Sequence, residues 1–334
     1  MNILEFTKEI LAIDSPTGYT RNVIKFLKDQ AEAYGYQTEI TPKGNLHVFV
    51  EGKDQSRRVG ISAHCDTLGA MVRSITPEGN LKFTKIGGLQ LPTADGEYCN
   101  IYTRDGKKYT GTILSSSPSS HVYKDAESKE RNEENMIVRL DERVENKEDV
   151  LKLGIQNGDF ICLDPKTTIT NGFIKSRFLD DKLSVGILFK LLDTFSKDKP
   201  SYDMVFVFST YEEVGHGSSY IPEMDEFLAC DMGCIGEDLS CTEYDVSICA
   251  KDSSGPYDYD MVTSLLNIAK EKDLPHAIDI YPMYGSDVSA ALRAGNNIKG
   301  ALVGPGVHAS HGMERSTESA ANAAYELLLG YLTK

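Results

Sequence analysis

The chain has 334 residues, of which 40% are hydrophobic and 25% are charged, and this composition is ordinary for a globular protein with a large core. No basic patch offsets its formal net charge of -15, which argues against nucleic acid or an anionic membrane as a partner. No apolar run approaches the roughly 20 residues that span a bilayer, and the N-terminus lacks the pattern of a secretory signal. We therefore expect a cytoplasmic protein.

The first 70 residues alternate between helical and strand patterns. Apolar residues at helical spacing predict two amphipathic helices, and short β-like runs follow them. The last of these runs is apolar and leads directly into His64 and Asp66. Ligands and catalytic groups favour such carboxyl ends of strands in open α/β sheets. The helices are expected between residues 3 and 13 and between 20 and 34, and the strands at 38–40, 46–50 and 59–63.

From about residue 71 to about residue 170, the pattern changes to short β-like runs separated by turns. A charged stretch at 124–134 offers little to bury and is expected to be an exposed loop. We interpret residues 71–170 as a small β domain inserted into an α/β domain that comprises residues 1–70 and 171–334. A hairpin-rich extension of a single domain is the alternative. The expected β runs are 71–75, 81–86, 101–104, 110–114 and 160–163, with a helical turn at 149–153.

The α/β pattern resumes at Asp180, and its central feature is a buried strand that ends in two glutamates. An amphipathic helix is expected after Asp180. The strand at 204–209 is apolar and runs towards Glu212 and Glu213, after which glycines break the pattern. Adjacent side chains on an extended segment point in opposite directions, so the two glutamates are expected to do different jobs. Further strands are expected at 231–235, 245–249, 277–280 and 301–303, and helices at 258–270, 287–294 and 317–332.

Five potential metal ligands lie at strand ends or turns. Two imidazoles and three carboxylates suit borderline divalent ions, with zinc first and cobalt or manganese as alternatives. One catalytic zinc needs fewer ligands, whereas two ions bridged by one carboxylate use all five, as in dinuclear hydrolases. Glu212 would then be the general base that takes a proton from water and passes it to the leaving amine. The five candidates are His64, Asp180, Glu213, Asp231 and His311.

Single residues of this set have ordinary alternative interpretations. Asp180 and Asp181 precede a helix and could be N-capping residues. Cys65 is interpreted as a small buried residue rather than a nucleophile. The seven cysteines are odd in number and contain no C-x-x-C pattern, so free thiols are expected rather than a disulfide framework or a zinc knuckle.

Five short motifs follow one another in an order that is more specific than any single residue. They are Ala63-His64-Cys65-Asp66, Leu179-Asp180-Asp181-Lys182, Glu212-Glu213-Val214-Gly215, Gly285-Ser286-Asp287 and Ser310-His311-Gly312-Met313-Glu314. In this order, the motifs resemble those of the tetrahedral (TET), deblocking or glutamyl aminopeptidase family of dinuclear metallopeptidases. The resemblance spans most of the chain.

The resemblance implies a fold, an assembly and an activity. The fold is a zinc-peptidase-like α/β catalytic domain with an inserted small β-barrel domain. The assembly is a homo-oligomer, often a dodecamer, to which the inserted domain contributes. The activity is the removal of N-terminal residues from short peptides.

The resemblance also implies roles for the site residues. Asp180 would bridge the two metal ions and Asp66 would orient His64. His64 and Asp231 would complete the coordination of the first ion, and Glu213 and His311 that of the second.

Two departures from the family pattern leave alternatives open. Thr67 stands where the family usually has Glu, and the last motif is one residue shorter than His-Ser-Pro-x-Glu. His308 is therefore a rival to His311 as the last ligand. Asp287 could line the substrate site or cap its helix. A related metal-dependent deacylase or carboxypeptidase acting on amino-acid derivatives, or a non-catalytic assembly subunit, is the alternative function.

Overall fold

The computed structural model describes residues 1–334, and the chain divides into two compact units. One unit comprises Met1–Thr67 and Lys166–Lys334, and the other comprises Leu68–Pro165. The first is an α/β unit and the second contains a closed barrel, so the predicted fold class is confirmed. Neither unit contains a helix that is both long and apolar enough to span a bilayer.

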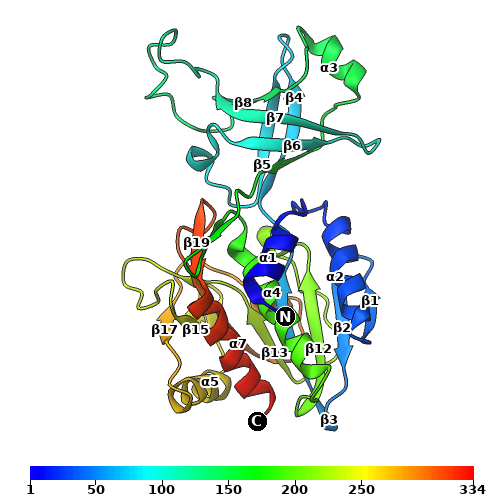
Figure 1. The fold of residues 1–334 in the computed structure, drawn as a ribbon, viewed down its shortest axis with the longest axis vertical. Coiled ribbons are helices and arrows are strands. Elements are labelled where there is room, and N and C mark those ends of the chain that lie inside the picture. Colours follow the sequence, from blue (N-terminus) through cyan, green and yellow to red (C-terminus); the bar gives the residue numbers. More distant parts are fainter. The chain divides into compact units, whose positions relative to one another are not determined.

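A ten-stranded sheet forms the centre of the α/β unit (Figure 1). Its four middle strands run parallel, and their apolar side chains are buried on both faces, as in parallel sheets that are covered from both sides. The path along the sheet is β1 (Gln37–Ile40), β2 (Leu46–Val50), β12 (Tyr202–Ser209), β3 (Asp54–His64), β13 (Glu226–Cys230), β18 (Lys299–Val307), β15 (Val246–Asp252) and β16 (Gly255–Pro256), with β14 (Gly233–Cys234) on β18 and β17 (His276–Ile280) on β15.

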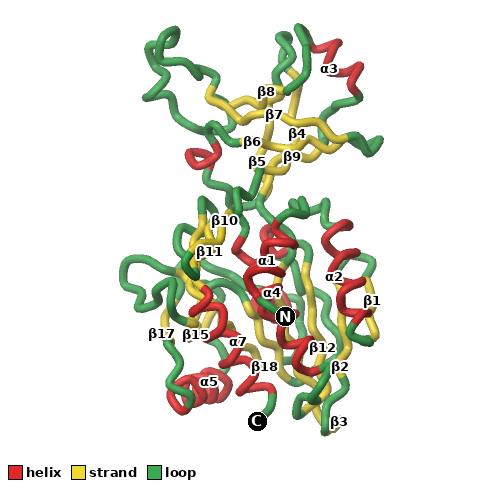
Figure 2. Tube along the Cα trace, in the orientation of Figure 1, coloured by secondary structure: helices red, strands yellow, loops and turns green.

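Helix α4 (Leu179–Phe195) lies in the middle of the helical layer, against β3 and β18 and between two other helices (Figure 2). Its side chains are buried along almost the whole length, including polar ones such as Lys182 and Asp193, so it lacks the solvent-exposed polar face of the predicted amphipathic helix. The reason is that helices, and not solvent, cover its outer side. The other helices of this unit are α1 (Ile3–Leu11) and α7 (Glu318–Leu332), which pack on α4, and α2 (Arg21–Ala33), α5 (Tyr259–Glu271) and α6 (Asp287–Arg293).

In place of the strand predicted at 231–235, the structure has strand β13 at Glu226–Cys230. Strand β13 ends at Cys230, because the fully buried run 226–230 pairs in parallel with β3 on one side and β18 on the other. Only Gly233 and Cys234 form a further short strand, β14. Asp231 therefore follows a strand end instead of opening a strand.

A separate three-stranded sheet, absent from the sequence prediction, carries the end of the last motif. Its strands are only three or four residues long and lack a clear apolar alternation. Glu314 opens the third strand, opposite Ser176. The strands are β10 (Thr168–Thr170), β11 (Phe173–Ser176) and β19 (Glu314–Thr317).

The second unit is a six-stranded closed barrel with its own apolar interior. Inward residues such as Leu81, Phe83 and Ile113 are fully buried and alternate with more exposed ones along their strands. Gly79 and Gly106 adopt left-handed φ values of 82° and 85° in the turns that join neighbouring strands. In order around the barrel the strands are β4 (Gly69–Ile75), β5 (Leu81–Ile86), β8 (Met136–Leu140), β7 (Lys108–Ser115), β6 (Tyr98–Tyr102) and β9 (Phe160–Leu163); α3 (Lys147–Leu153) precedes β9.

Candidate active site

The candidate site lies at the carboxyl ends of three adjacent parallel strands. Strand β3 ends at His64, β13 ends just before Asp231, and β12 is followed by the 3-10 turn η2 (Glu212–Val214). Because these ends meet at one edge of the sheet, side chains far apart in the sequence come together there.

Asp180 lies between two imidazoles. Its Oδ1 atom is 3.0 Å from His64 Nε2, and its Oδ2 atom is 3.6 Å from His311 Nε2. The backbone at Asp180 and Asp181 is not helical. One carboxylate thus faces a histidine with each of its oxygens, an arrangement that suits a bridge between two cations.

The two adjacent glutamates occupy different positions, although they lie in a 3-10 turn and not on the extended segment that the sequence predicted. Glu213 Oε2 lies 3.7 Å from His311 Nε2, and this side chain is 3% exposed. Glu212 Oε2 lies 3.8 Å from His64 Nε2, and this side chain is 15% exposed. Glu213 is therefore the more enclosed group, and Glu212 keeps access to solvent.

Asp181 joins the site although the sequence analysis gave it no role there. Donor atoms of His64, Asp181 and Asp231 lie within 4.8 Å of one another, and all three residues are buried. Asp181 Oδ2 accepts a hydrogen bond from the backbone N–H of His64 at 3.0 Å. The Asp-Asp pair was the available signal, but both residues could equally have been helix caps.

Two buried carboxylate oxygens in the cluster have no hydrogen-bond partner. They are Glu213 Oε1 and Asp181 Oδ1. A buried carboxylate oxygen is normally paired with a donor or a cation, because leaving it unpaired is costly. Together with the two imidazoles, these atoms form a donor set that suits zinc-like divalent ions. The residues present therefore fit a metal centre.

The pKa values of the site residues also fit a metal centre. Burial raises the pKa of Glu212 and of Glu213 well above the usual value, and neighbouring carboxylates add to the shift. Burial, followed by the charge of Asp180, raises the pKa of Asp231 to about 7. Burial lowers the pKa of His64, but its hydrogen bond to Asp180 and the surrounding carboxylates outweigh burial and raise that pKa well above normal. The cluster holds more negative charge than its histidines neutralise.

Asp66 connects the His64 motif to the glutamate turn. Its carboxylate accepts a short 2.6 Å hydrogen bond from Thr17 Oγ1 and longer ones from the backbone N–H groups of Glu212 and Glu213, at 3.3 and 3.4 Å. His64 Nδ1 lies 3.0 Å from the backbone oxygen of Asp66 and 3.7 Å from its carboxylate. Asp66 therefore contacts both His64 and the turn that carries Glu212 and Glu213.

Glu314 is a second residue to which the sequence analysis gave no role. Its carboxylate accepts hydrogen bonds from the backbone N–H groups of Asp180, at 3.0 Å, and His311, at 2.9 Å. Burial, followed by the charge of Asp180, raises its pKa to about 8. The spacing of His311 and Glu314 in the last motif was the available signal. His308, the rival ligand, is exposed and pairs through its backbone with Arg315.

The remaining candidates have structural surroundings. Asp287 accepts hydrogen bonds from Ser209 Oγ and from the Ser218 N–H, whereas Ser286 caps α6. The Cys65 thiol donates to the Ser209 carbonyl, and burial raises its pKa, which disfavours the nucleophilic thiolate.

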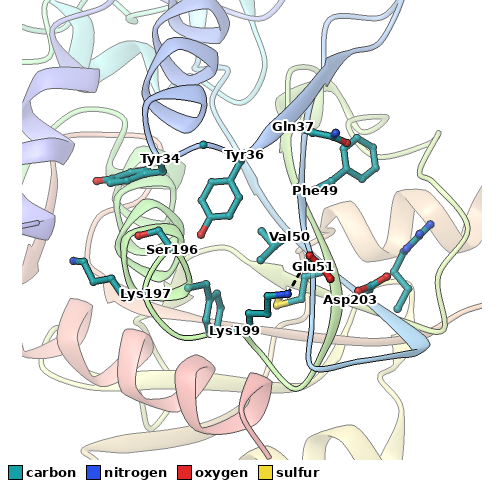
Figure 3. A pocket seen from close by; sticks show the side chains of 14 residues that line it. Tyr34, Tyr36, Gln37, Phe49, Val50, Glu51, Ser196, Lys197, Lys199 and Asp203 are labelled. Atoms are coloured by element: carbon teal, nitrogen blue, oxygen red, sulfur yellow. Dashed lines mark ion pairs between the residues drawn. The ribbon is translucent and has the colours of Figure 1, made fainter.

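A cavity at the start of β12, at the opposite end of this strand from Glu212, carries no comparable chemistry. It has a volume of about 680 Å³ and is lined by aromatic and charged side chains, including Tyr34, Tyr36 and Phe49 (Figure 3). Lys199 there pairs with Glu51 at 3.0 Å. No cluster of potential metal ligands accompanies it.

The sequence comparisons point to one family of proteins. The family described as M42 glutamyl aminopeptidase matches residues 44–327. YhfE of Bacillus subtilis (strain 168), an assumed aminopeptidase, is 45% identical over 98% of this chain and 96% of its own length. The glutamyl aminopeptidase of Lactococcus lactis subsp. cremoris (strain MG1363) is 24% identical over 64% of this chain and 61% of its own.

Solved structures share the fold. An aminopeptidase from Desulfurococcus kamchatkensis superposes with a TM-score of 0.88 at 22% identity, covering 99% of this chain and 94% of its own. The TET1 peptidase of Pyrococcus horikoshii, which can assemble into a tetrahedron or a large octahedral shell, gives a TM-score of 0.87 at 22% identity over 99% of both chains.

Proposed function

Because this chain belongs to the M42 glutamyl aminopeptidase family and is a peptide hydrolase, we propose that it is a dinuclear metal-dependent aminopeptidase that removes N-terminal residues from short peptides. The family resemblance stated from the sequence motifs is thereby confirmed. The observation that carries the proposal is the position of Asp180 between His64 and His311.

Asp180 would be shared by two divalent ions, with zinc as the first candidate. His64 and Asp231 would complete one set of ligands, and Glu213 and His311 the other. The unpartnered Glu213 Oε1 atom and the mutual proximity of His64 and Asp231 support this division. When bound, the two ions would supply Lewis-acid polarisation of the scissile carbonyl and a water of lowered pKa.

Glu212 would act as the general base. Its carboxylate lies beside His64 yet remains partly exposed, so a water molecule and a peptide can both reach it. A carboxylate whose pKa is raised by burial is better suited to accept a proton near neutral pH and to return it to the leaving amine. Asp66 holds the backbone N–H of Glu212 and so fixes the start of this turn.

The acidic surroundings would also favour a free amino terminus in the substrate. Buried carboxylates such as Asp231 attract a positively charged α-amino group, whereas an acylated terminus offers no charge. This is the property that separates an aminopeptidase from a deacylase acting at a similar site.

Hydrolysis of a panel of aminoacyl chromogenic substrates by chelator-stripped protein tests the proposal, with zinc, cobalt or manganese added back. The panel contains acidic, aliphatic, basic and N-acylated members. We expect metal-restored cleavage of the free-amine substrates only. Cleavage of the N-acylated substrates alone would establish a deacylase and overturn the proposal.

We also propose that the protein forms a homo-oligomer, to which the inserted β domain contributes. The support is the fold shared with a peptidase that assembles into closed shells. Light scattering on the purified protein measures the assembly directly.

A further inference from the structure

Lys43 reaches from a distant hairpin turn to the segment that carries Glu212. It lies between β1 and β2, 173 residues before His216, whose carbonyl oxygen it binds. Its Nζ atom donates hydrogen bonds to the carbonyl oxygens of His216 and Gly217, the latter at 2.9 Å, and to Ser219 Oγ at 2.9 Å. We refer to residues 211–219 as the glutamate loop.

Lys43 also contacts the other end of the same loop. Its Nζ atom lies 5.7 Å from the centre of the Tyr211 ring, at a distance typical of a cation–π contact. The Tyr211 ring in turn stacks on His216 with 5.0 Å between ring centres. The Lys43 ammonium group therefore contacts Tyr211, just before Glu212, and also residues that follow the 3-10 turn.

The glutamate loop depends on outside groups for its shape. Val214, Gly215 and His216 at its tip are exposed, and exposed loops with few buried contacts open readily. Asp66 and Asp287 accept hydrogen bonds from N–H groups of the loop. Lys43 complements these carboxylates, because it binds the carbonyl groups of the same loop.

Substrate binding by Lys43 is a weaker interpretation. An ammonium group has three N–H donors, and all three are directed at the glutamate loop. Nothing remains to bind a substrate carboxylate unless the contacts with the loop are first broken.

We propose that Lys43 is a positioning residue that holds Glu212 in the geometry needed for proton transfer. This inference rests on the base role proposed above for Glu212. A general base must lie within hydrogen-bond reach of the proton it accepts, and a misplacement of about 1 Å can lower the rate about 100-fold. Loss of Lys43 would release the His216 carbonyl and leave the Gly217 carbonyl bound to Asn45 Nδ2 alone, which would allow such a displacement without removing any proposed metal ligand.

The test compares Lys43→Met with Lys25→Met, a matched substitution of an exposed lysine on α2. We expect Lys43→Met to lower kcat about 10- to 100-fold, with KM within about twofold and metal content unchanged. Hydrogen exchange should accelerate in the glutamate loop, residues 211–219, and stay unchanged in the strands of the sheet. Lys43→Arg should recover part of the loss, because it keeps the charge and several donors. Lys25→Met should behave like the wild-type protein.

Two results would overturn the proposal: unchanged exchange in the glutamate loop, or accelerated exchange with an unchanged kcat. Should Lys43→Met fail to fold, Ser219→Ala removes one acceptor and should shift kcat and exchange in the same direction by less. Glu212→Gln is measured alongside. Its retained activity would refute the base role itself, whereas its inactivity combined with an unaffected Lys43→Met would refute only the role of Lys43.

Discussion

Asp180 illustrates what a single residue contributes that its neighbours do not. Asp180 and Asp181 both lie in the first turn of α4, and nothing in the sequence alone distinguishes a shared ligand from a helix cap. The structure directs the two oxygens of Asp180 to His64 and His311, and it directs Asp181 to the backbone of His64. A distinction of this kind depends on side-chain direction, which only the packed site determines.

The choice between His311 and His308 leads to a prediction at the same scale. We expect His311→Ala to retain about one metal ion per subunit instead of two, because Nε2 of His311 lies beside Asp180 and Glu213. His308→Ala should retain both ions, because His308 is exposed and uses its backbone to pair with Arg315. Metal analysis after dialysis measures the occupancy of each variant. The reverse ranking would exchange the two assignments.

At the scale of elements, long apolar strands could be predicted from the sequence and short ones could not. Strand β12 and its approach to Glu212 follow from a buried apolar run. Strand β19 has four residues and is defined by its pairing with β11 and by one bridge between Arg315 and His308, so its local sequence carries little signal. The contact of Glu314 with Asp180 and His311 depends on that pairing, which explains why its role was missed.

Strand β2 contains a buried group whose titration should affect stability. His47 is fully buried, and neither ring nitrogen has a hydrogen-bond partner in the protein. Burial lowers its pKa from the ordinary value of 6.5. Below that value, the unfolded chain binds a proton that the folded ring resists, so this residue should make the free energy of unfolding fall as the pH falls. The slope is at most about 1.4 kcal/mol per pH unit for one proton.

His47→Leu should remove this contribution. Between pH 7.5 and 5.5, the variant should lose less stability than the wild-type protein in urea unfolding monitored by circular dichroism. His121→Leu, at an exposed histidine of the second unit, is the control and should leave the slope unchanged. Parallel pH profiles for His47→Leu and the wild-type protein would contradict the prediction.

At the scale of the whole molecule, metal removal should destabilise the two units unequally. The proposed ligands all lie in the α/β unit, where removal of cations leaves buried carboxylates uncompensated. Each of the two proposed sites, kept at 100 times its Kd, stabilises the folded state by about 2.7 kcal/mol, so we expect chelation of both ions to lower the melting temperature of this unit by roughly 10–20 °C.

Hydrogen exchange separates the units in that experiment. Exchange should accelerate in β3, β12 and α4 after chelation and stay unchanged in the barrel strands. Added zinc, cobalt or manganese should restore protection. An equal effect on both units would mean that the chelator acts elsewhere than on the proposed site.

Strand β3 pairs with β12 and β13, both of which are synthesised much later. The chain passes through the whole barrel before it returns, and the Cys65 thiol, just after β3, meets its partner Ser209 144 residues downstream. At about 5–20 residues per second, the ribosome needs roughly 7–30 s to supply β12 after β3 has emerged. During that interval the apolar second half of β3 has no neighbouring strand and can pair with other chains. The yield of active enzyme should therefore be limited by chaperone supply and translation speed rather than by the stability of the finished fold.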